Sequence, residues 1–293
     1  MRLLGISLHT SRKVLSKKRL ILVQTTNRSR KELFPINPVL QTIHERTSLR
    51  VYRDEPIREA DLQAILQAAL RAPTAGNMLL YSVLVIRDQA TKDRLSQTCD
   101  NQPFIARAPL ILIFLADYQR WFDYFHLCLV PEFCKETGLD WREPDLGDLF
   151  IALDDALIAA QTAVLAAESL GIGSCYIGDI MENYETHREL LNLPDYTFPA
   201  AMLCLGYYPE GHERKLRERF APEYIIHQEH YRRLSSAELR QMFAKLEASL
   251  PPGNRFGAKN VGQFMYARKT GSAFAREMSR SIRAALKNWQ GGR

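Results

Sequence analysis

Two arginines and two hydroxyl residues lie within five positions of the sequence, in the segment Arg46-Thr47-Ser48-Leu49-Arg50. An arginine side chain can bond two phosphate oxygens at once, and hydroxyl groups add further donors. A segment of this composition is therefore able to hold a phosphate group. A solvent-exposed basic turn has the same composition, and for such a short motif the exposed turn is the more common outcome.

The glycine-rich segment "GIGSCYIGDI", residues 171–180, is a second candidate for ligand binding. A dinucleotide-binding fingerprint requires a glycine three positions after Gly173, where this chain has Tyr176. A P-loop requires Lys and then Ser or Thr after its last glycine, but Asp179 follows Gly178. Both phosphate loops are therefore excluded, although the small residues still allow the backbone to approach a flat ligand closely.

Other groups of reactive side chains in the sequence do not predict a catalytic or metal site. His227 and His230 are three positions apart, but no third ligand of suitable spacing accompanies them, so we expect no metal site. Asp154 and Asp155 lie in an apolar helical segment, where we expect them to bond neighbouring backbone or to face a partner subunit. No Ser-His-Asp set and no catalytic carboxylate pair stands out, which is typical of an enzyme whose cofactor carries the chemistry.

The composition is that of a globular protein. The chain has 293 residues, of which 46% are hydrophobic and 25% are charged. No run approaches the roughly eighteen apolar residues of a membrane span, so we expect no membrane segment. Five cysteines without a C-x-x-C pair favour free thiols in a reducing, cytoplasmic compartment.

The net charge of +6 belongs to the start of the chain. Residues 1–31 hold nine Lys or Arg and no acid, which leaves 30 basic and 33 acidic residues in the rest. A slightly acidic body argues against a nucleic-acid partner. We expect residues 1–35 to be a disordered extension without a catalytic role. A transit-like peptide, a nucleic-acid-binding arm and sequence upstream of the true start codon remain alternatives.

Helical and strand patterns alternate from Pro35 onward and predict one α+β domain over residues 36–293. Ser235 and Glu238 form a capping box for a helix that runs to about Leu250. Residues 271–289 predict a basic amphipathic helix, and the Ala- and Leu-rich segment 146–170 predicts a central core helix. The other predicted helices are 37–45 and 59–72, and the predicted strands are 81–88, 108–117, 173–180 and 198–208.

Four motifs in order resemble the FMN-dependent nitroreductase family. They are R-T-S-L-R, A-P-T-A-G-N, a long Ala-rich helix that leads into G-I-G-S-C-Y-I-G, and R-E-R-F after a strand that ends in G-Y-Y-P. The resemblance covers the chain from about Asn37 to the C-terminus. It implies a nitroreductase-like sandwich with a mainly antiparallel central sheet flanked by helices, and a homodimer that binds FMN non-covalently at the subunit interface.

The resemblance also implies a set of cofactor-binding residues. One basic cluster would hold the phosphate and ribityl chain, a second would reach the same phosphate, and backbone amides would face the flavin ring near N5. In that order the residues are Arg46, Thr47, Ser48 and Arg50; Arg217 and Arg219; and Tyr176, Ile177, Gly178 and Asp179, with Thr74, Asn77 and Gln102 as further contacts.

Three of these residues can also have an ordinary structural role in place of a cofactor-binding one. Arg217 can belong to a solvated charged strand, Tyr176 can be a core aromatic residue, and Gln102 can cap a helix start. The chain also departs from the family at Leu79, where many relatives carry a glutamine that bonds the flavin. This departure leaves the redox tuning of the flavin open.

The implied function is an NAD(P)H-dependent reductase of nitroaromatics, quinones or flavins that works by ping-pong hydride transfer at FMN N5. No side chain is assigned a catalytic role. A non-catalytic or sensor-type FMN-binding protein is the alternative. Aromatic residues between 118 and 145, among them Trp121 and Tyr124, are expected to bind the acceptor, although the helical part of this segment can also be ordinary core.

Overall fold

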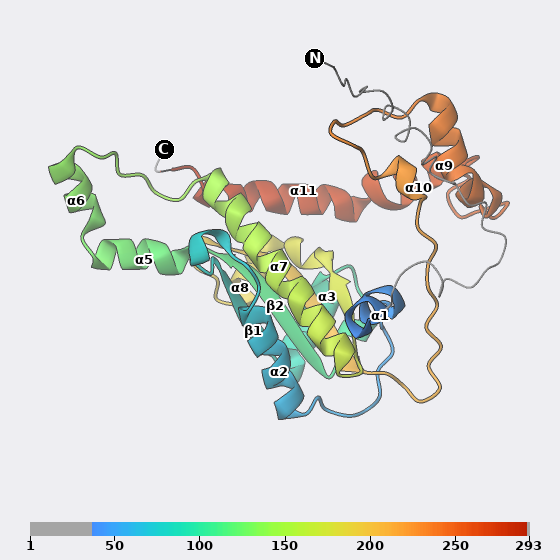
Figure 1. Ribbon diagram of the computed structural model, residues 1–293, viewed down its shortest axis with the longest axis horizontal. Coiled ribbons are helices and arrows are strands. Elements are labelled where there is room, and N and C mark those ends of the chain that lie inside the picture. Colours follow the sequence, from blue (N-terminus) through green and yellow to red (C-terminus); the bar gives the residue numbers. More distant parts are fainter. Residues whose placement is uncertain (1–36, 292–293) are drawn as a thin grey trace, which may run out of the picture. The chain divides into compact units, whose positions relative to one another are not determined.

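The structure is a computed structural model that describes residues 37–291 (Figure 1). The predicted extension 1–35 lies outside the described residues, so it stays a prediction. The chain divides into two units, Met1–Gln41 and Thr42–Arg293, and the structure describes only residues 37–41 of the first. Helix α1 (Pro38–Glu45) begins one residue after the predicted start and ends at the predicted residue. The sheet and all the candidate site residues belong to the second unit.

Four strands form one sheet in the order β1 (Tyr81–Ile86), β2 (Leu110–Asp117), β4 (Thr197–Tyr207) and β3 (Ile172–Ile177). Each neighbouring pair is antiparallel, which confirms the predicted sheet type. The central strand β2 is buried along its whole length, and β4 is buried in all but its last residue. Burial on both faces explains why these strands read as continuous apolar runs.

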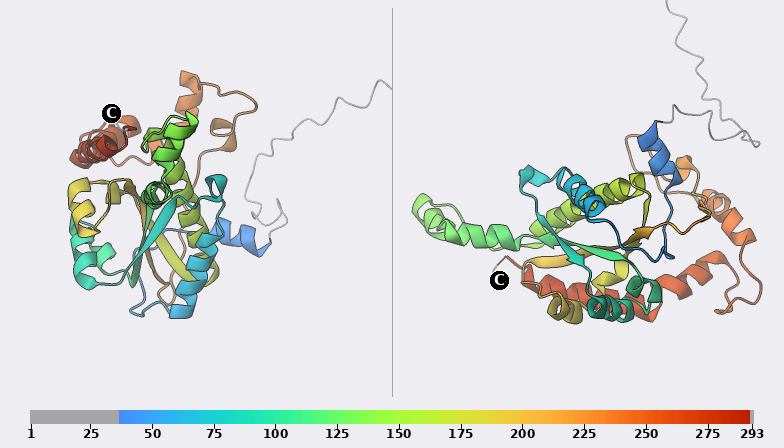
Figure 2. Two further views of the ribbon diagram at one scale, coloured as in Figure 1. Left: turned by 90° about the vertical axis from the view of Figure 1, so that its left-hand side faces the viewer. Right: turned by 90° about the horizontal axis from the view of Figure 1, so that it is seen from below.

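The two faces of the sheet are covered by different helices. Alternate residues of β2 point to opposite faces: Leu112 packs with α2 (Glu59–Leu70) and α7 (Leu146–Ser169), whereas Ile113 packs with α3 (Gln89–Thr98) and α4 (Pro103–Ala106). Figure 2 shows α2 and α7 on one side of the sheet and α3 on the other. The α+β sandwich that the sequence predicts is therefore confirmed.

Helix α7 lies on the sheet through a stripe of alanines. Ala156, Ala160 and Ala163 are fully buried, and their small side chains let the helix approach the strands closely. By length and composition alone α7 is able to span a membrane, yet this stripe packs into the core of the protein. The expectation of a central core helix holds for one face only, because Ile151 and Ile158 on the same helix are exposed.

The remaining helices lie around this centre. Helices α5 (Gln119–Leu127) and α6 (Val130–Thr137) follow β2 and lie beyond the end of the sheet (Figure 1). The capping box of Ser235 and Glu238 is present at the start of α9 (Ser236–Ala248), as predicted. The bounds of the others are α8 (Tyr184–Leu190), α10 (Val261–Met265) and α11 (Ala273–Ala285).

Strand β3 ends three residues earlier than its sequence predicts. The pattern of residues 173–180 predicts a strand throughout, but β3 ends at Ile177 and the chain continues as a 3-10 turn, η3 (Gly178–Met181). The apolar side chain of Ile180 is fully buried in this turn, against the same core cluster as Ile177. Hydrophobicity alone therefore does not distinguish the strand from the turn.

Candidate functional site

The arginine segment lies along the edge strand β3. Ser48 forms an isolated parallel bridge with Ser174, and the Leu49 N–H donates a 2.9 Å hydrogen bond to the Ser174 carbonyl. The Leu49 side chain is fully buried. These contacts fix the backbone between Arg46 and Arg50 against the strand that leads to Gly178.

Gly173 makes this close approach possible. A Cβ atom at Gly173 would lie 2.5 Å from Leu49 Cδ2 and 2.9 Å from Tyr208 Cζ, and both distances are too short for any side chain. The sequence suggested that the small residues of this segment admit a flat ligand. For Gly173 the structure gives another reason, because the space above it is filled by the side chains of Leu49 and Tyr208.

The two guanidinium groups of the segment are free to bind an anion. Within residues 37–291, neither Arg46 nor Arg50 has a carboxylate oxygen within 4.0 Å. Arg50 is exposed and lies 5.7 Å from the centre of the Phe104 ring, and Arg46 is half-buried. With the hydroxyls of Thr47 and Ser48 beside them, these groups supply the donors that a phosphate requires.

A buried carboxylate anchors a third arginine beside this segment. Glu168, near the end of α7, accepts hydrogen bonds of 3.1 and 3.0 Å from the Tyr208 hydroxyl. It also forms a 2.7 Å ion pair with Arg214, whose guanidinium lies 4.5 Å from the centre of the Tyr208 ring. Burial raises the pKa of Glu168, although the Tyr208 hydrogen bond and the charges of Arg214 and Arg46 oppose the rise.

Glu168 and Arg214 are not among the residues that the sequence predicts for the site. Arg214 donates a hydrogen bond of 3.5 Å to the Glu45 carbonyl, at the start of the arginine segment. The predicted Arg217 and Arg219 follow in the same chain segment and are exposed. Their contact with a phosphate stays a prediction. A signal for Glu168 was present in the sequence, because it is a lone acid near the end of a long apolar helix.

The other end of β3 brings two predicted residues together. Gln102 Nε2 donates to Asp179 Oδ2 at 2.8 Å and to the Cys99 carbonyl at 2.9 Å. Gly178 is exposed, and a Cβ atom there would meet only Met181 Cε at 4.0 Å, so the space above its backbone is open. Ile177 is buried in the core, so its side chain is not available to a ligand.

Tyr176 lies on β3, between Ser174 and Gly178. Its side chain is half-buried, and its hydroxyl donates a 3.4 Å hydrogen bond to Gln161 of α7. Burial raises the pKa of Tyr176 to about 12, and the positive charge of Arg46 opposes this rise. The structure therefore places Tyr176 near the basic segment, at the boundary of the core.

The loop that contains Thr74 and Asn77 is held from α7. Asp155 accepts hydrogen bonds from the Ala75 N–H at 2.9 Å and the Leu80 N–H at 3.1 Å, which confirms that this aspartate bonds backbone. Asn77 has a positive φ of 57° in this tight turn. The loop is thus fixed through α7 and not through the arginine segment.

Trp121 and Tyr124 of α5 have different surroundings. The Trp121 indole donates a 2.8 Å hydrogen bond to the Met78 carbonyl, so this residue attaches α5 to the loop that holds Thr74. Tyr124 is 53% exposed and meets the Trp121 ring edge-on at 6.1 Å. The structure therefore gives Trp121 a packing role and leaves Tyr124 accessible.

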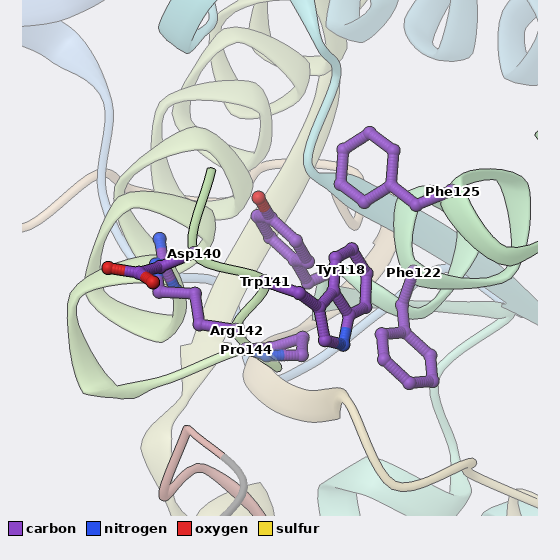
Figure 3. A pocket seen from close by; sticks show the side chains of 7 residues that line it. All are labelled: Tyr118, Phe122, Phe125, Asp140, Trp141, Arg142 and Pro144. Carbon is purple, nitrogen blue, oxygen red and sulfur yellow. The ribbon is translucent and has the colours of Figure 1, made fainter. Parts of the chain in front are cut away.

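A cavity of about 190 Å³ lies next to α5 (Figure 3). Its aromatic lining comes from α5 and from the segment before α7, and Trp121 and Tyr124 are not part of it. The rings of Phe122 and Trp141, both labelled in Figure 3, have centres 6.4 Å apart. The full lining is Tyr118, Phe122, Phe125, Asp140, Trp141, Arg142 and Pro144.

The arrangement suits a long ligand with an anionic end and a flat end. The segment that carries the two guanidiniums pairs with Ser174, and the open backbone of Gly178 lies four residues after Ser174 in the chain. At about 3.3 Å per residue, this separation is roughly 13 Å. The fully buried hydroxyl of Ser174 also has no hydrogen-bond partner within residues 37–291. These features fit the phosphate and ring of FMN.

Comparison with known proteins agrees with an FMN site. The sequence profile of the Nitroreductase family matches residues 43–207. The FMN reductase (NAD(P)H) of Bacillus subtilis is 32% identical over 199 residues, which cover 67% of this chain and 75% of the relative. The oxygen-insensitive NADPH nitroreductase of Salmonella typhimurium is 31% identical over 68% of this chain and 77% of its own length.

A solved structure extends the likeness over more of the chain. The NADPH:FMN oxidoreductase from Vibrio harveyi, complexed with NAD+, superimposes with a TM-score of 0.68 at 25% identity. The match covers 85% of this chain and 98% of the Vibrio chain. Sequence profile, curated relatives and solved structure therefore agree with the geometry of β3 and its arginine segment, and the chain belongs to the nitroreductase family.

Proposed function

We propose that this protein is an FMN-dependent oxidoreductase that uses NAD(P)H to reduce nitroaromatics, quinones or flavins. The observation that carries the proposal is the pair of guanidiniums, Arg46 and Arg50, on a segment that is fixed beside the strand leading to the open backbone of Gly178. Bound FMN would supply hydride transfer at N5, first from NAD(P)H and then to the acceptor, in a ping-pong cycle.

The residues of this chain bind and orient the cofactor. Arg46 and Arg50 hold the phosphate, with the hydroxyls of Thr47 and Ser48 as further donors. The backbone amides around Gly178 would hold the flavin ring, and these fixed N–H donors would stabilise negative charge on it. Thr74, Asn77, Gln102, Tyr176, Ile177, Asp179, Arg217 and Arg219 complete the proposed cofactor site, and Trp121 and Tyr124 the acceptor site.

The active form in this proposal is a homodimer. Along α7 the apolar residues Phe150, Ile151, Leu157 and Ile158 are exposed, with 42–62% of each accessible. An exposed helix face with this many apolar side chains, with the exposed Asp154 among them, is typical of a protein–protein interface. A second copy of the chain is the partner that the family resemblance implies, and packing α7 against it would cover these side chains.

The proposed location is the cytoplasm. All five cysteines are free thiols, and four of them, Cys99, Cys134, Cys175 and Cys204, are buried. Reduced thiols are typical of proteins kept in a reducing compartment.

Anaerobic reduction of the purified protein tests the function. A yellow protein that is bleached by NADH or NADPH, and then regains its colour with a quinone, supports the enzyme. A protein that holds flavin but is not bleached by either nicotinamide is the non-catalytic alternative. A colourless protein that also fails to bind added FMN contradicts both.

Substitution of the arginines tests the site itself. Arg46→Ala, Arg50→Ala and Arg219→Ala should each weaken FMN binding, because a charge-assisted hydrogen bond is worth about 1.5–3 kcal/mol. This corresponds to roughly tenfold to over a hundredfold in Kd. Arg53→Ala is the matched control, since Arg53 pairs with the exposed Glu55 at 3.1 Å and with no other carboxylate among the described residues. Equal affinity for FMN in all four variants would contradict the assigned phosphate site.

A further inference from the structure

A second cavity is formed by residues to which the proposed function gives no role. Its volume is about 540 Å³, which is within the range of small-molecule sites. The lining comes from the loop before α10, from the turn between α10 and α11, from the start of α11 and from the turn after α3. The lining residues that bear on its chemistry are Asp100, Arg255, Phe256, Arg268, Lys269 and Phe274.

Three of these lining residues are cations without an acidic partner. Arg255, Arg268 and Lys269 are exposed, and none of them has a carboxylate oxygen within 4.0 Å among residues 37–291. Like charges around one cavity repel each other, and a concave surface strengthens their combined field. An anion in the cavity would relieve this repulsion, and a guanidinium group matches phosphate oxygens in particular.

The loop that carries Arg255 is held by the side chain before it. Asn254 Oδ1 accepts hydrogen bonds from the N–H groups of Phe256 at 3.3 Å and Ala258 at 3.1 Å. The Arg255 guanidinium lies 4.6 Å from the centre of the Phe256 ring. The loop therefore presents a cation and an aromatic ring together at the cavity.

A π-helical turn, η5 (Tyr266–Thr270), carries the other two cations. Turns of this kind are rare and often occur at functional sites. The Ser272 hydroxyl donates a 2.6 Å hydrogen bond to the Lys269 carbonyl, which fixes the end of the turn. The Lys269 ammonium lies 4.9 Å from the centre of the Phe274 ring, so a second cation lies beside a second ring.

The lining also offers a hydrogen-bond acceptor and aromatic surface. Asp100 is exposed, and no Lys or Arg within residues 37–291 pairs with it. Its carboxylate accepts hydrogen bonds from hydroxyl or amino groups, which a phosphate dianion does not have. Phe256 is 37% exposed and Phe274 is half-buried, so both rings are able to contact a flat group.

We propose that this cavity binds a nucleotide through a phosphate monoester. The three cations hold the phosphate, the phenylalanine rings contact the base, and Asp100 accepts hydrogen bonds from ribose hydroxyls or from the amino group of the base. The proposal goes beyond the proposed function, which assigns no ligand to this cavity. Binding of the nucleotide does not depend on whether FMN is held at Arg46.

Two sources carry this chemistry, namely a free nucleotide and the 2′-phosphoadenosine end of NADPH. Only the second rests on the proposed function. Asp100 connects the cavity to the candidate cofactor site along the chain, because Gln102, two residues later, donates a 2.8 Å hydrogen bond to Asp179. Both sources are therefore included in the test.

Isothermal titration calorimetry of the full chain loaded with FMN tests the binding. The probes are adenosine 2′,5′-bisphosphate, adenosine and inorganic phosphate. The bisphosphate should bind at least roughly tenfold more tightly than either other probe, because it alone offers both the ring and the phosphate monoester. Equal affinity for inorganic phosphate would show an unspecific basic surface and overturn the proposal. Absence of bisphosphate binding would also overturn it.

Variants of the lining locate the binding. Arg268→Gln and Lys269→Gln should each weaken bisphosphate binding by roughly tenfold to a hundredfold, since each removes a charge-assisted hydrogen bond. Arg283→Gln is the matched control, because Arg283 is an exposed cation of α11 outside the lining. Equal affinity in these three variants overturns the proposal. So does loss of bisphosphate binding in Arg46→Ala, because the probe would then occupy the phosphate site proposed for FMN.

Steady-state kinetics distinguishes the two sources. If the ligand is NADPH, Arg268→Gln should raise KM for NADPH by roughly tenfold or more and leave KM for NADH unchanged, because NADH lacks the 2′-phosphate. If the ligand is a free nucleotide, both KM values stay unchanged while the calorimetric loss remains. An equal rise in KM for NADPH and NADH would contradict a phosphate contact and overturn the proposal.

Discussion

Arg214 and Glu168 form a 2.7 Å ion pair that joins the segment after β4 to the end of α7. The two side chains differ in burial: 1% of the Glu168 side chain is exposed, against 33% for Arg214. The pair therefore gives the buried Glu168 carboxylate, which lies beside the arginine segment, a charged partner. Glu168 also lies close enough to Arg46 to be affected by its charge. Without Arg214, Glu168 would compete with a bound phosphate for the Arg46 guanidinium.

Removal of Arg214 should destabilise the fold. In Arg214→Ala the Tyr208 hydroxyl is the one donor left to the buried Glu168 carboxylate within residues 37–291, so the free energy of unfolding should fall by about 1–3 kcal/mol. Urea denaturation checks this value. Arg217→Ala is the control, because Arg217 is exposed and should change stability by less than about 0.5 kcal/mol. Equal stability of the two variants would show that the ion pair contributes nothing.

Tyr124→Ala should change acceptor selectivity without loss of structure. Because Tyr124 is exposed beside Trp121, its removal should alter the ratio of kcat/KM for nitroaromatics and quinones by several-fold, with FMN content and Tm unchanged. Trp121→Ala should also lower Tm, since the indole bonds the Met78 carbonyl and packs in the core. Stopped-flow rates of the two half-reactions separate these effects. Unchanged oxidative rates in both variants would exclude α5 from the acceptor site.

A charge on the exposed face of α7 should dissociate the proposed dimer. Ile158→Glu introduces a carboxylate that is hydrated in the monomer but would be buried in the interface, so sedimentation should show a shift toward monomer. Leu70→Glu is the control, because Leu70 is a similarly exposed apolar residue at the end of α2. A monomeric unaltered protein, or an Ile158→Glu variant that stays dimeric, would contradict the interface.

The stability of the protein should depend on Glu182 in a defined pH window. Burial, followed by the charge of Asp179, raises the pKa of Glu182 from the ordinary value of 4.5 to about 8, so folding takes up a proton between these values. The free energy of unfolding that Glu182 contributes is fully present below about pH 4.5 and is lost as pH rises to about 8. Thermal melts across this window should therefore favour Glu182→Gln over the unaltered protein increasingly as pH rises. A constant difference in Tm would contradict the raised pKa.

Periodicity determined most of the elements in advance, because it depends on which residues are apolar within one segment. The strand β2 and the helix α7 have long apolar patterns, and their bounds agree with the structure within two residues. The polar helix α3, "QATKDRLSQT", has no such pattern, and the sequence did not predict it. It begins instead with a local signal, the Asp88 side chain, which accepts a 2.8 Å hydrogen bond from the Thr91 N–H.

The sequence by itself also determined the family and which residue types are available to bind a phosphate, since Arg46 to Arg50 are neighbours in the chain. The tertiary structure decided which distant groups meet them. Gln102 and Asp179 are 77 positions apart, and Glu168 and Arg214 are 46 positions apart, so no local pattern connects either pair. The environment of Glu182 requires carboxyl groups from η3, the end of α3 and α11 to converge. Burial and charge at one atom depend on all the elements packed around it, and only the folded chain brings those elements together.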